Sequence, residues 1–317
     1  MKRLALNAIL LLASVFPTST SAQDWPTKPV RIVVSFAPGG AADVWARLIA
    51  EPLSAALKQS VVIENRGGGG GMIAAQQVAR AEPDGYTILM GGLAAQILAP
   101  SVAANPGFDG LRDFSHIAYI GGPPITLVVP PASELRSIAD LIVAAKADKF
   151  SGYASSGVGT VGQLVVEYVA GRNGVKLTHI PYNTAAFADI IGGRVPMGSF
   201  TWGAALGQLQ GGTLRALAVT TETRRPEMPD VPTFKEQGYD LVASTWFSFS
   251  GPKGMPKEIV QRLNQETLRI LERPEIRQKA MQDAFDPKPL TPEQVEAFFV
   301  AEAARWTPVA QAAMKKQ

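Results

Sequence analysis

The sequence has no cysteine and only two histidines among its 317 residues. Without cysteine the fold can contain neither a disulfide nor a thiolate metal site. The two imidazoles, His116 and His179, also exclude a metal site with three or more histidine ligands. A chain of this length can bury about 75% of its unfolded surface. We therefore expect the core alone to stabilise the fold, with no metal site.

A clustered excess of positive charge is missing as well. The chain has 30 basic and 27 acidic residues; two of the basic ones lie in the first 22 residues, and the remaining 28 leave a net charge of +1. Nucleic-acid binding would require a basic face, and no basic block is visible. Affinity for an anionic ligand must therefore come from local geometry.

No apolar run reaches the length of about 20 residues that a membrane-spanning helix needs. The run Leu4–Phe16 follows two basic residues and precedes three small ones that end at Ala22. This order is typical of a secretory signal peptide cleaved after Ala22. A membrane anchor is the alternative, but the run is too short to span a bilayer. We therefore expect an exported, soluble protein.

Strand-like and helix-like patterns alternate along the chain. Residues 30–36 and 61–65 are rich in β-branched residues, whereas 42–57 places apolar residues at helical spacing. With a second helix at 72–81 and a third strand at 87–90, the order predicts a parallel sheet with right-handed crossovers. The alternation resumes after His116, and three further helices are predicted for the tail, at 258–271, 275–283 and 292–313.

Two α/β halves and a helical tail predict a two-lobe body with a cleft between the lobes. The length is also that of two domains. We expect residues 1–22 to be the signal peptide, 23–119 plus 222–317 to form lobe I, and 120–221 to form lobe II.

Glycine-rich loops follow the first three predicted strands, at 38–43, 67–71 and 91–92. Carboxyl ends of parallel strands share one sheet edge, where open α/β sheets bind ligands. The first loop also opens a helix, whose free N–H groups suit a carboxylate. An ordinary strand–helix turn is the alternative. Asp43 either stiffens this loop by accepting N–H bonds or contacts a ligand that carries an amino group.

The second half contains Gly157-x-Gly159-x-x-Gly162 after a predicted strand. A dinucleotide site of this kind requires an acidic residue about 20 positions further on, but the next strand ends at Tyr182 without one. The pattern is better explained as a second anion site, made by a helix N-terminus and the hydroxyls of Ser156 and Thr160.

Catalytic patterns are missing. The sequence has no G-x-S-x-G elbow, its spacing suggests no Ser-His-Asp set, and nothing marks a pair of carboxylates. We therefore expect no enzymatic activity. Trp202 and Trp246 lie near predicted strand ends and could line the cleft, although burial in the core is the alternative.

Several stretches occur together in one known family. They include W-P-x-K-P-V-R-I-V-V-S-F-A-P-G-G-x-x-D-x-x-A-R from Trp25, E-N-R-G at 64–67, P-D-G-Y-T at 83–87, Y-A-S-S-G at 153–157, L-R-A-L-A-V-T at 214–220 and P-D-V-P-T-F at 229–234. In this order they resemble the Bug receptors, which are the substrate-binding proteins of tripartite tricarboxylate transporters. The resemblance covers nearly all of residues 23–317.

The resemblance implies an α/β, two-lobe periplasmic-binding-protein (Venus flytrap) fold with a helical C-terminal tail. It also implies a periplasmic location, a mono- or dicarboxylate ligand, delivery to membrane permease subunits and no cofactor. In some members the partner is a signalling protein instead, and the sequence leaves this alternative open. We expect a monomer. The pocket positions implied are Phe36, Gly39, Gly40, Asp43, Ser156, Thr160 and Tyr182.

The sequence departs from the family pattern at positions that the resemblance places in or near the ligand-binding pocket. Asn183 replaces a common lysine, Gln163 replaces a histidine, and the strand that often ends in Phe-Asp-Asn is here Ser199-Phe200-Thr201. We add Phe200 and Thr201 to the expected ligand-binding residues. The missing aspartate would hold an amino group, so we expect an aromatic or aliphatic carboxylate, unless Phe200 and Trp202 pack in the core.

Overall fold

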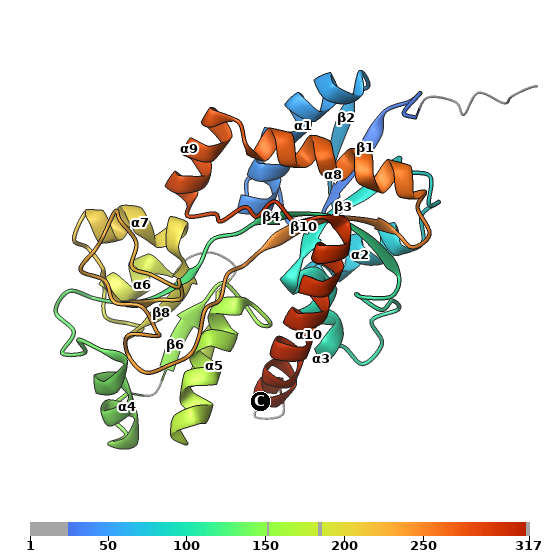
Figure 1. Cartoon of the computed structure of the whole chain (residues 1–317). Helices are drawn as coiled ribbons and strands as arrows, with labels where there is room; N and C mark the ends of the chain where they lie inside the picture. The colour runs from blue at the N-terminus through green and yellow to red at the C-terminus, as the bar shows by residue number, and fades with distance from the viewer. Residues whose placement is uncertain (1–24, 151, 183–185, 315–317) are drawn as a thin grey trace, which may run out of the picture.

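A computed structural model describes residues 25–150, 152–182 and 186–314. It contains two five-stranded sheets with helices packed around them, and this confirms the predicted two-lobe α/β fold with a helical tail (Figure 1). Among these residues no helix combines the length and hydropathy needed to cross a membrane. They also contain no cluster of three or more side chains suited to a metal ion.

The sheet of lobe I has the order β2-β1-β3-β10-β4. Its strands are β1 (Val30–Val34), β2 (Val61–Asn65), β3 (Thr87–Gly92), β4 (Phe114–Gly121) and β10 (Phe247–Pro252). The pairs β1–β2 and β1–β3 are parallel, as predicted, whereas β10 runs antiparallel to both neighbours. The carboxyl ends of β1, β2 and β3 therefore share one edge of the sheet.

The sheet of lobe II has the order β7-β6-β8-β5-β9. Its strands are β5 (Ile125–Val129), β6 (Gly152–Ser155), β7 (Thr178–Pro181), β8 (Gly198–Thr201) and β9 (Arg215–Val219). β6 is parallel to β7 and β8, and β5 is antiparallel to β8 and β9. Lobe II thus repeats the mixed arrangement of lobe I.

Helices cover both sheets. In lobe I these are α1 (Ala41–Leu57), α2 (Met72–Ala79), a π-helical turn η2 (Leu93–Leu98) with α3 (Ala99–Val102), α8 (Lys257–Leu271), α9 (Pro274–Asp283) and α10 (Pro292–Met314). Lobe II has α4 (Ile138–Lys146), α5 (Val161–Asn173), α6 (Phe187–Ile191) and α7 (Trp202–Gln210). α10 runs beside α5 of lobe II (Figure 1), and one apolar cluster joins both helices through Phe299, Trp306 and Leu164.

Two segments connect the lobes. The first links β4 to β5 through residues 122–124, and the second leads into β10 through residues 244–246. The stretch between β9 and the second connection belongs by hydrogen bonding to lobe II, since Phe234 N–H donates to Val219 O and Ala243 N–H donates to Thr220 O. We therefore propose that lobe II extends to about residue 243, beyond the 221 expected from composition.

Candidate functional site

The loop between β1 and α1 leaves an open backbone at the carboxyl edge of the first sheet. Gly39 has φ +79°, and no atom lies within 4 Å of the position that a Cβ would occupy. Gly40 precedes α1, and no side chain caps this helix. Gly39, Gly40 and Ala41 are all exposed. The 17-residue helix therefore begins at the surface without a side-chain cap, an arrangement that suits an anion.

Asp43 holds this loop in place. Its side chain is almost fully buried, and Oδ2 accepts the N–H of Gly39 at 2.8 Å. Oδ1 accepts Arg47 Nε at 3.0 Å and Asn65 Nδ2 at 2.9 Å. Burial raises the pKa of Asp43, but these hydrogen bonds outweigh it and hold the pKa below its usual value. The carboxylate is therefore ionised, and both of its oxygens are occupied by the protein.

Asn65 extends the same network to the end of β2. Its Nδ2 also donates to Phe36 O at 3.2 Å, and its Oδ1 accepts from Arg47 at 3.1 Å. The loop is thus fixed at Gly39 and at Phe36. The sequence carried a signal for this role, because Asn65 lies in the E-N-R-G stretch, but no spacing rule connects it with Asp43.

The glycine run 67–71 differs from Gly39 in having close neighbours, although only Gly71 of the run is buried. A Cβ on Gly71 would lie 2.7 Å from Ala95 Cβ, and one on Gly70 would lie 2.8 Å from Ala99 Cβ. A Cβ on Gly67 would lie 3.4 Å from the backbone N of Ala37. The run therefore allows η2, α3 and the β1–α1 loop to approach one another closely.

The loop between β6 and α5 forms the corresponding edge of lobe II. Thr160 caps α5: its Oγ1 accepts Gln163 N–H at 3.4 Å and donates to Gly157 O at 2.8 Å. Gly159 has φ +76° with no atom within 4 Å of a Cβ position, and Ser156 is exposed. Ser156 and Val158 are the exposed residues of this loop, Gly159 is half-buried with open space at its Cβ position, and Thr160 supports the shape of the loop.

A serine–histidine pair lies beneath this loop. Ser155 Oγ is 2.7 Å from His179 Nε2, and His179 stacks on Tyr153 at 5.1 Å. Burial lowers the pKa of His179, so the imidazole is neutral at pH 7. Ser155 is completely buried and also hydrogen-bonds to Gly157. The pair fixes the loop and presents no accessible nucleophile.

Tyr182 follows β7 and forms hydrogen bonds both to the end of β6 and to α6. Its N–H donates to Ser155 O at 2.9 Å, and its hydroxyl donates to Asp189 Oδ2 at 2.6 Å. The hydrogen bond to Asp189 raises the pKa of Tyr182. Asp189 is also paired with Arg194. Asn183, which replaces the common lysine, lies outside the described residues.

Phe200 and Trp202 are not in the cleft. Phe200 is 1% exposed and packs edge-to-face on Phe187 at 5.1 Å between ring centroids. Trp202 is fully buried, and its indole N–H donates to Glu227. Trp246 is also buried. The expectation that Phe200 lines the site is therefore wrong, because its side of β8 faces the core cluster of lobe II.

Phe36 and Thr201 remain accessible. Phe36 is half-buried and packs edge-to-face on Phe247 at 5.8 Å. Thr201 is also half-buried and stands at the N-terminus of α7 without capping it. Phe36 is thus the aromatic residue that the β1–α1 loop itself can offer to a ligand.

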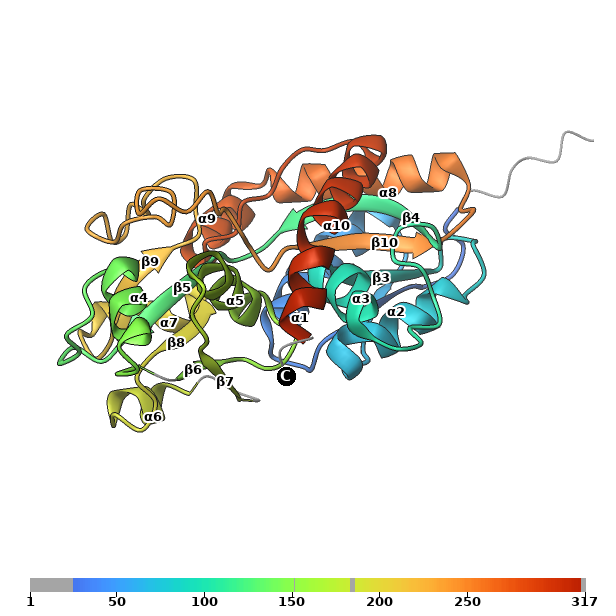
Figure 2. The same cartoon turned by 90° about the horizontal axis from the view of Figure 1, so that it is seen from below.

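The two edges belong to facing parts of the lobes. In Figure 1 the N-terminal end of α1 (darker blue) points toward lobe II, and in Figure 2 the β1–α1 loop lies on the same side of the connecting segments as the ends of β6 and β7. The β1–α1 loop and the ends of β6 and β7 therefore lie on one side of the connecting segments.

Known proteins share both sequence and fold with this chain. A family model described as the tripartite tricarboxylate transporter family receptor matches residues 45–314. Protein BugT of Bordetella pertussis is 33% identical over 317 residues, covering 96% of this chain and 95% of BugT.

Two solved structures agree with this result. R. palustris Rpa4515 with adipate has a TM-score of 0.81 at 35% identity, with 92% of this chain and 98% of that chain covered. The periplasmic binding protein BugD has a TM-score of 0.78 at 32% identity, with 91% and 98% covered. The chain therefore belongs to the receptor family of the tripartite tricarboxylate transporters, as its resemblance to the Bug receptors predicts.

Proposed function

We propose that this protein is a periplasmic receptor that captures a small organic carboxylate between its lobes and delivers it to the membrane permease of a tripartite transporter. The observation that carries the proposal is the uncapped N-terminus of α1 behind the open backbone of Gly39 and Gly40. Such a terminus favours a carboxylate. Two related structures support the ligand class, since their names record adipate and, for MatC of Rhodopseudomonas palustris at 27% identity, malate.

Backbone N–H groups and hydroxyls, and not cations, would hold the carboxylate. The arginines that adjoin the site in sequence are each paired with a protein carboxylate: Arg47 with Asp43, Arg66 with Glu64 and Arg194 with Asp189. We propose direct ligand contacts for Phe36, Gly39, Gly40, Ser156 and Thr201, and supporting roles for Asp43, Thr160 and Tyr182.

The same network argues against an amino-acid ligand. Both oxygens of Asp43 accept protein donors, and Asp189 is engaged by Tyr182 and Arg194. An α-ammonium would have no free carboxylate among these groups, and burying an unpaired charge costs several kcal/mol. We therefore propose that the ligand lacks an amino group.

A competition experiment tests this function. Adipate, benzoate and glutamate are compared by thermal shift and calorimetry with residues 23–317. A ligand at about 100 times its Kd adds about 2.7 kcal/mol to the free energy of unfolding. We expect adipate or benzoate to shift the melting temperature and glutamate to have no effect. Tightest binding by glutamate, or no shift by any acid at millimolar concentration, would contradict the proposal.

Delivery to a permease and the monomeric state are further parts of the proposal. Both rest on family membership. A strain that lacks the receptor gene but keeps the permease subunits should lose uptake of the acid identified above. Unchanged uptake would favour a sensory role, in which the loaded receptor contacts a signalling partner.

A further inference from the structure

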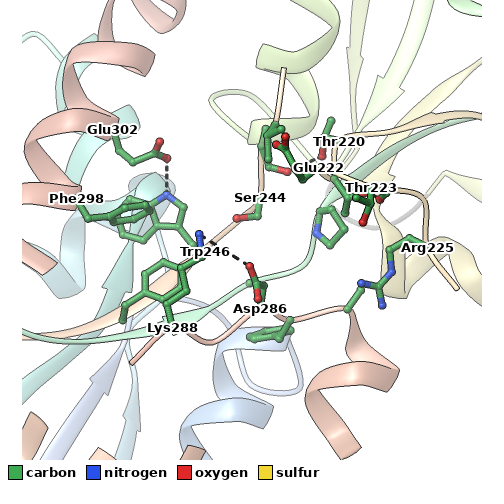
Figure 3. Close-up of a pocket in the computed structure, with 18 of the residues that line it drawn as sticks. Thr220, Glu222, Thr223, Arg225, Ser244, Trp246, Asp286, Lys288, Phe298 and Glu302 are labelled. Atoms are coloured by element: carbon green, nitrogen blue, oxygen red, sulfur yellow. Dashed lines mark hydrogen bonds and ion pairs between the residues drawn. The ribbon is translucent and has the colours of Figure 1, made fainter. Parts of the chain in front are cut away.

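A second pocket, of about 530 Å³, lies behind the segments that connect the lobes (Figure 3). It is bounded by residues 220–226 of lobe II, by Ser244 and Trp246 of the second connection, by residues 284–288 after α9, and by α10. No residue of the loops 36–40 and 156–160 lines it. In Figure 2, α9 and the first turns of α10 lie on the opposite side of the connections from those loops. The pocket is therefore separate from the proposed carboxylate site.

Two cations of this pocket retain free hydrogen-bond donors. Lys288 Nζ lies 3.9 Å from Asp286, and Arg305 lies 3.9 Å from Glu302, distances too long for hydrogen bonds. Glu302 Oε2 instead accepts the indole N–H groups of Trp246 at 2.8 Å and Trp306 at 3.1 Å. The carboxylate of Glu302 therefore accepts hydrogen bonds from the two indoles and forms none with Arg305.

Two charges that lobe II contributes to the rim are already paired with residues outside the pocket. Arg224 donates to both oxygens of Glu236, at 2.9 and 3.0 Å. Glu222 pairs with Lys235 at 2.5 Å. The Asp286 side chain is 82% exposed and can turn into water. An anion entering the pocket would therefore meet Lys288 and Arg305 as available partners.

Phe298 adds an aromatic surface to the lining of the same pocket. Phe298 and Arg305 are seven positions apart on α10 and lie on one face of the helix. Phe298 is half-buried and packs edge-to-face on Tyr119 and on Trp246, each at 5.0 Å. Its neighbours thus hold the ring, and its remaining surface can contact an apolar group.

We propose that this pocket is a second ligand site, for a small aromatic carboxylate. The carboxylate lies between Lys288 and Arg305, and the ring packs on Phe298. Residues 220–226 of lobe II and residues 286–305 of lobe I both line the pocket. Its shape therefore changes with the angle between the lobes, and an occupant is coupled to that angle.

The test is a titration with benzoate, followed by calorimetry, in the Gly39→Val background, where binding at the carboxylate site is removed. We expect one equivalent of benzoate to bind. The double variant Lys288→Ala with Arg305→Ala should weaken this binding at least tenfold. The double variant Arg269→Ala with Arg277→Ala removes the same charge from exposed positions outside the pocket and should leave the affinity unchanged.

Three results would overturn the proposal. They are no binding of benzoate at millimolar concentration, equal affinity in the two double variants, and displacement of benzoate by an equal concentration of inorganic phosphate, which would show that the ring is not recognised. None of them bears on whether adipate binds to the unsubstituted protein. Failure of this site is thus distinguishable from failure of the proposed function.

Discussion

Replacing Asp43 by asparagine tests the central physical claim about the carboxylate site. The substitution preserves size but leaves one acceptor oxygen in place of two. We expect the amide oxygen of the new asparagine to face Arg47 and Asn65, because both of them donate hydrogen bonds. The NH2 group of the amide then faces the N–H of Gly39, and two donors cannot form a hydrogen bond. Gly39 then loses its anchor, and the backbone N–H groups of the β1–α1 loop lose their fixed direction.

The cost can be worked out from the contacts. The bond from Gly39 to a charged acceptor contributes about 1.5–3 kcal/mol. The attraction to Arg47 adds less than about 1 kcal/mol, because the Arg47 side chain is 55% exposed. We expect Asp43→Asn to lower the free energy of unfolding by about 2–3 kcal/mol in urea denaturation. We also expect adipate affinity to fall at least tenfold by calorimetry.

Asp109→Asn is the matched control. Asp109 accepts the N–H groups of Leu111 and Arg112 and the side chain of Arg112, and these bonds hold its pKa below the usual value against the effect of burial. It precedes β4, at the opposite edge of the same sheet. Asp109→Asn should lose stability but keep its affinity. If Asp43→Asn binds as tightly as Asp109→Asn, the carboxylate does not depend on the β1–α1 loop, and the reasoning fails.

Three further predictions concern the loop, the hinge and acid stability. Gly39→Val should abolish adipate binding measured by calorimetry. The control Gly254→Val, at a residue with a similar φ of +88° and open space at the far edge of the sheet, should bind as the unsubstituted protein does; equal affinity of the two variants would show that the ligand does not bind at the β1–α1 loop. Small-angle scattering should show a smaller radius of gyration at saturating adipate, and an unchanged profile would contradict closure. Burial lowers the pKa of His116 to about 3, so the folded state binds fewer protons than the unfolded state below about pH 6.5, and stability decreases as the pH is lowered. His116→Phe should remove about 1–2 kcal/mol of the loss that urea denaturation measures between pH 6.5 and 5; an unchanged loss would assign it to other groups.

The sequence was sufficient to predict the parallel core of lobe I and the position of its first loop. A buried β-branched run identifies β1, shorter apolar runs identify β2 and β3, and the parallel order brings their glycine loops to one edge. Positive φ at Gly39 and the accessible start of α1 follow from local chemistry. Local patterns are informative here because Gly39 and Asp43 are four positions apart, whereas the contribution of Asn65, which lies 22 positions after Asp43, could not be derived from spacing.

The orientation of β8 could not be predicted in the same way. Strand periodicity shows that Phe200 and its neighbours Ser199 and Thr201 point to opposite faces, but it does not show which face is the core. That choice is made by Phe187 on α6, a contact between elements that no spacing rule relates. Residues 220–243 present the same difficulty, since their hydrogen bonds to β9 involve no helix or strand that composition would reveal.

The end of α9 connects the two proposed sites. Ala284 packs in the core of lobe II, whereas the next residue, Phe285, packs in the core of lobe I and stacks on Trp45 at 4.1 Å. The indole N–H of Trp45 donates to Asp283 at 2.9 Å, and Trp45 lies on α1 two residues after Asp43. Ala284 and Phe285 also line the pocket behind the connections. A rotation of the lobes must change the surroundings of at least one of these adjacent residues, because they are fixed to different cores. The start of α1 and the second pocket therefore contact the same short segment, and we expect an occupant of either site to change the angle between the lobes and thereby the affinity of the other site.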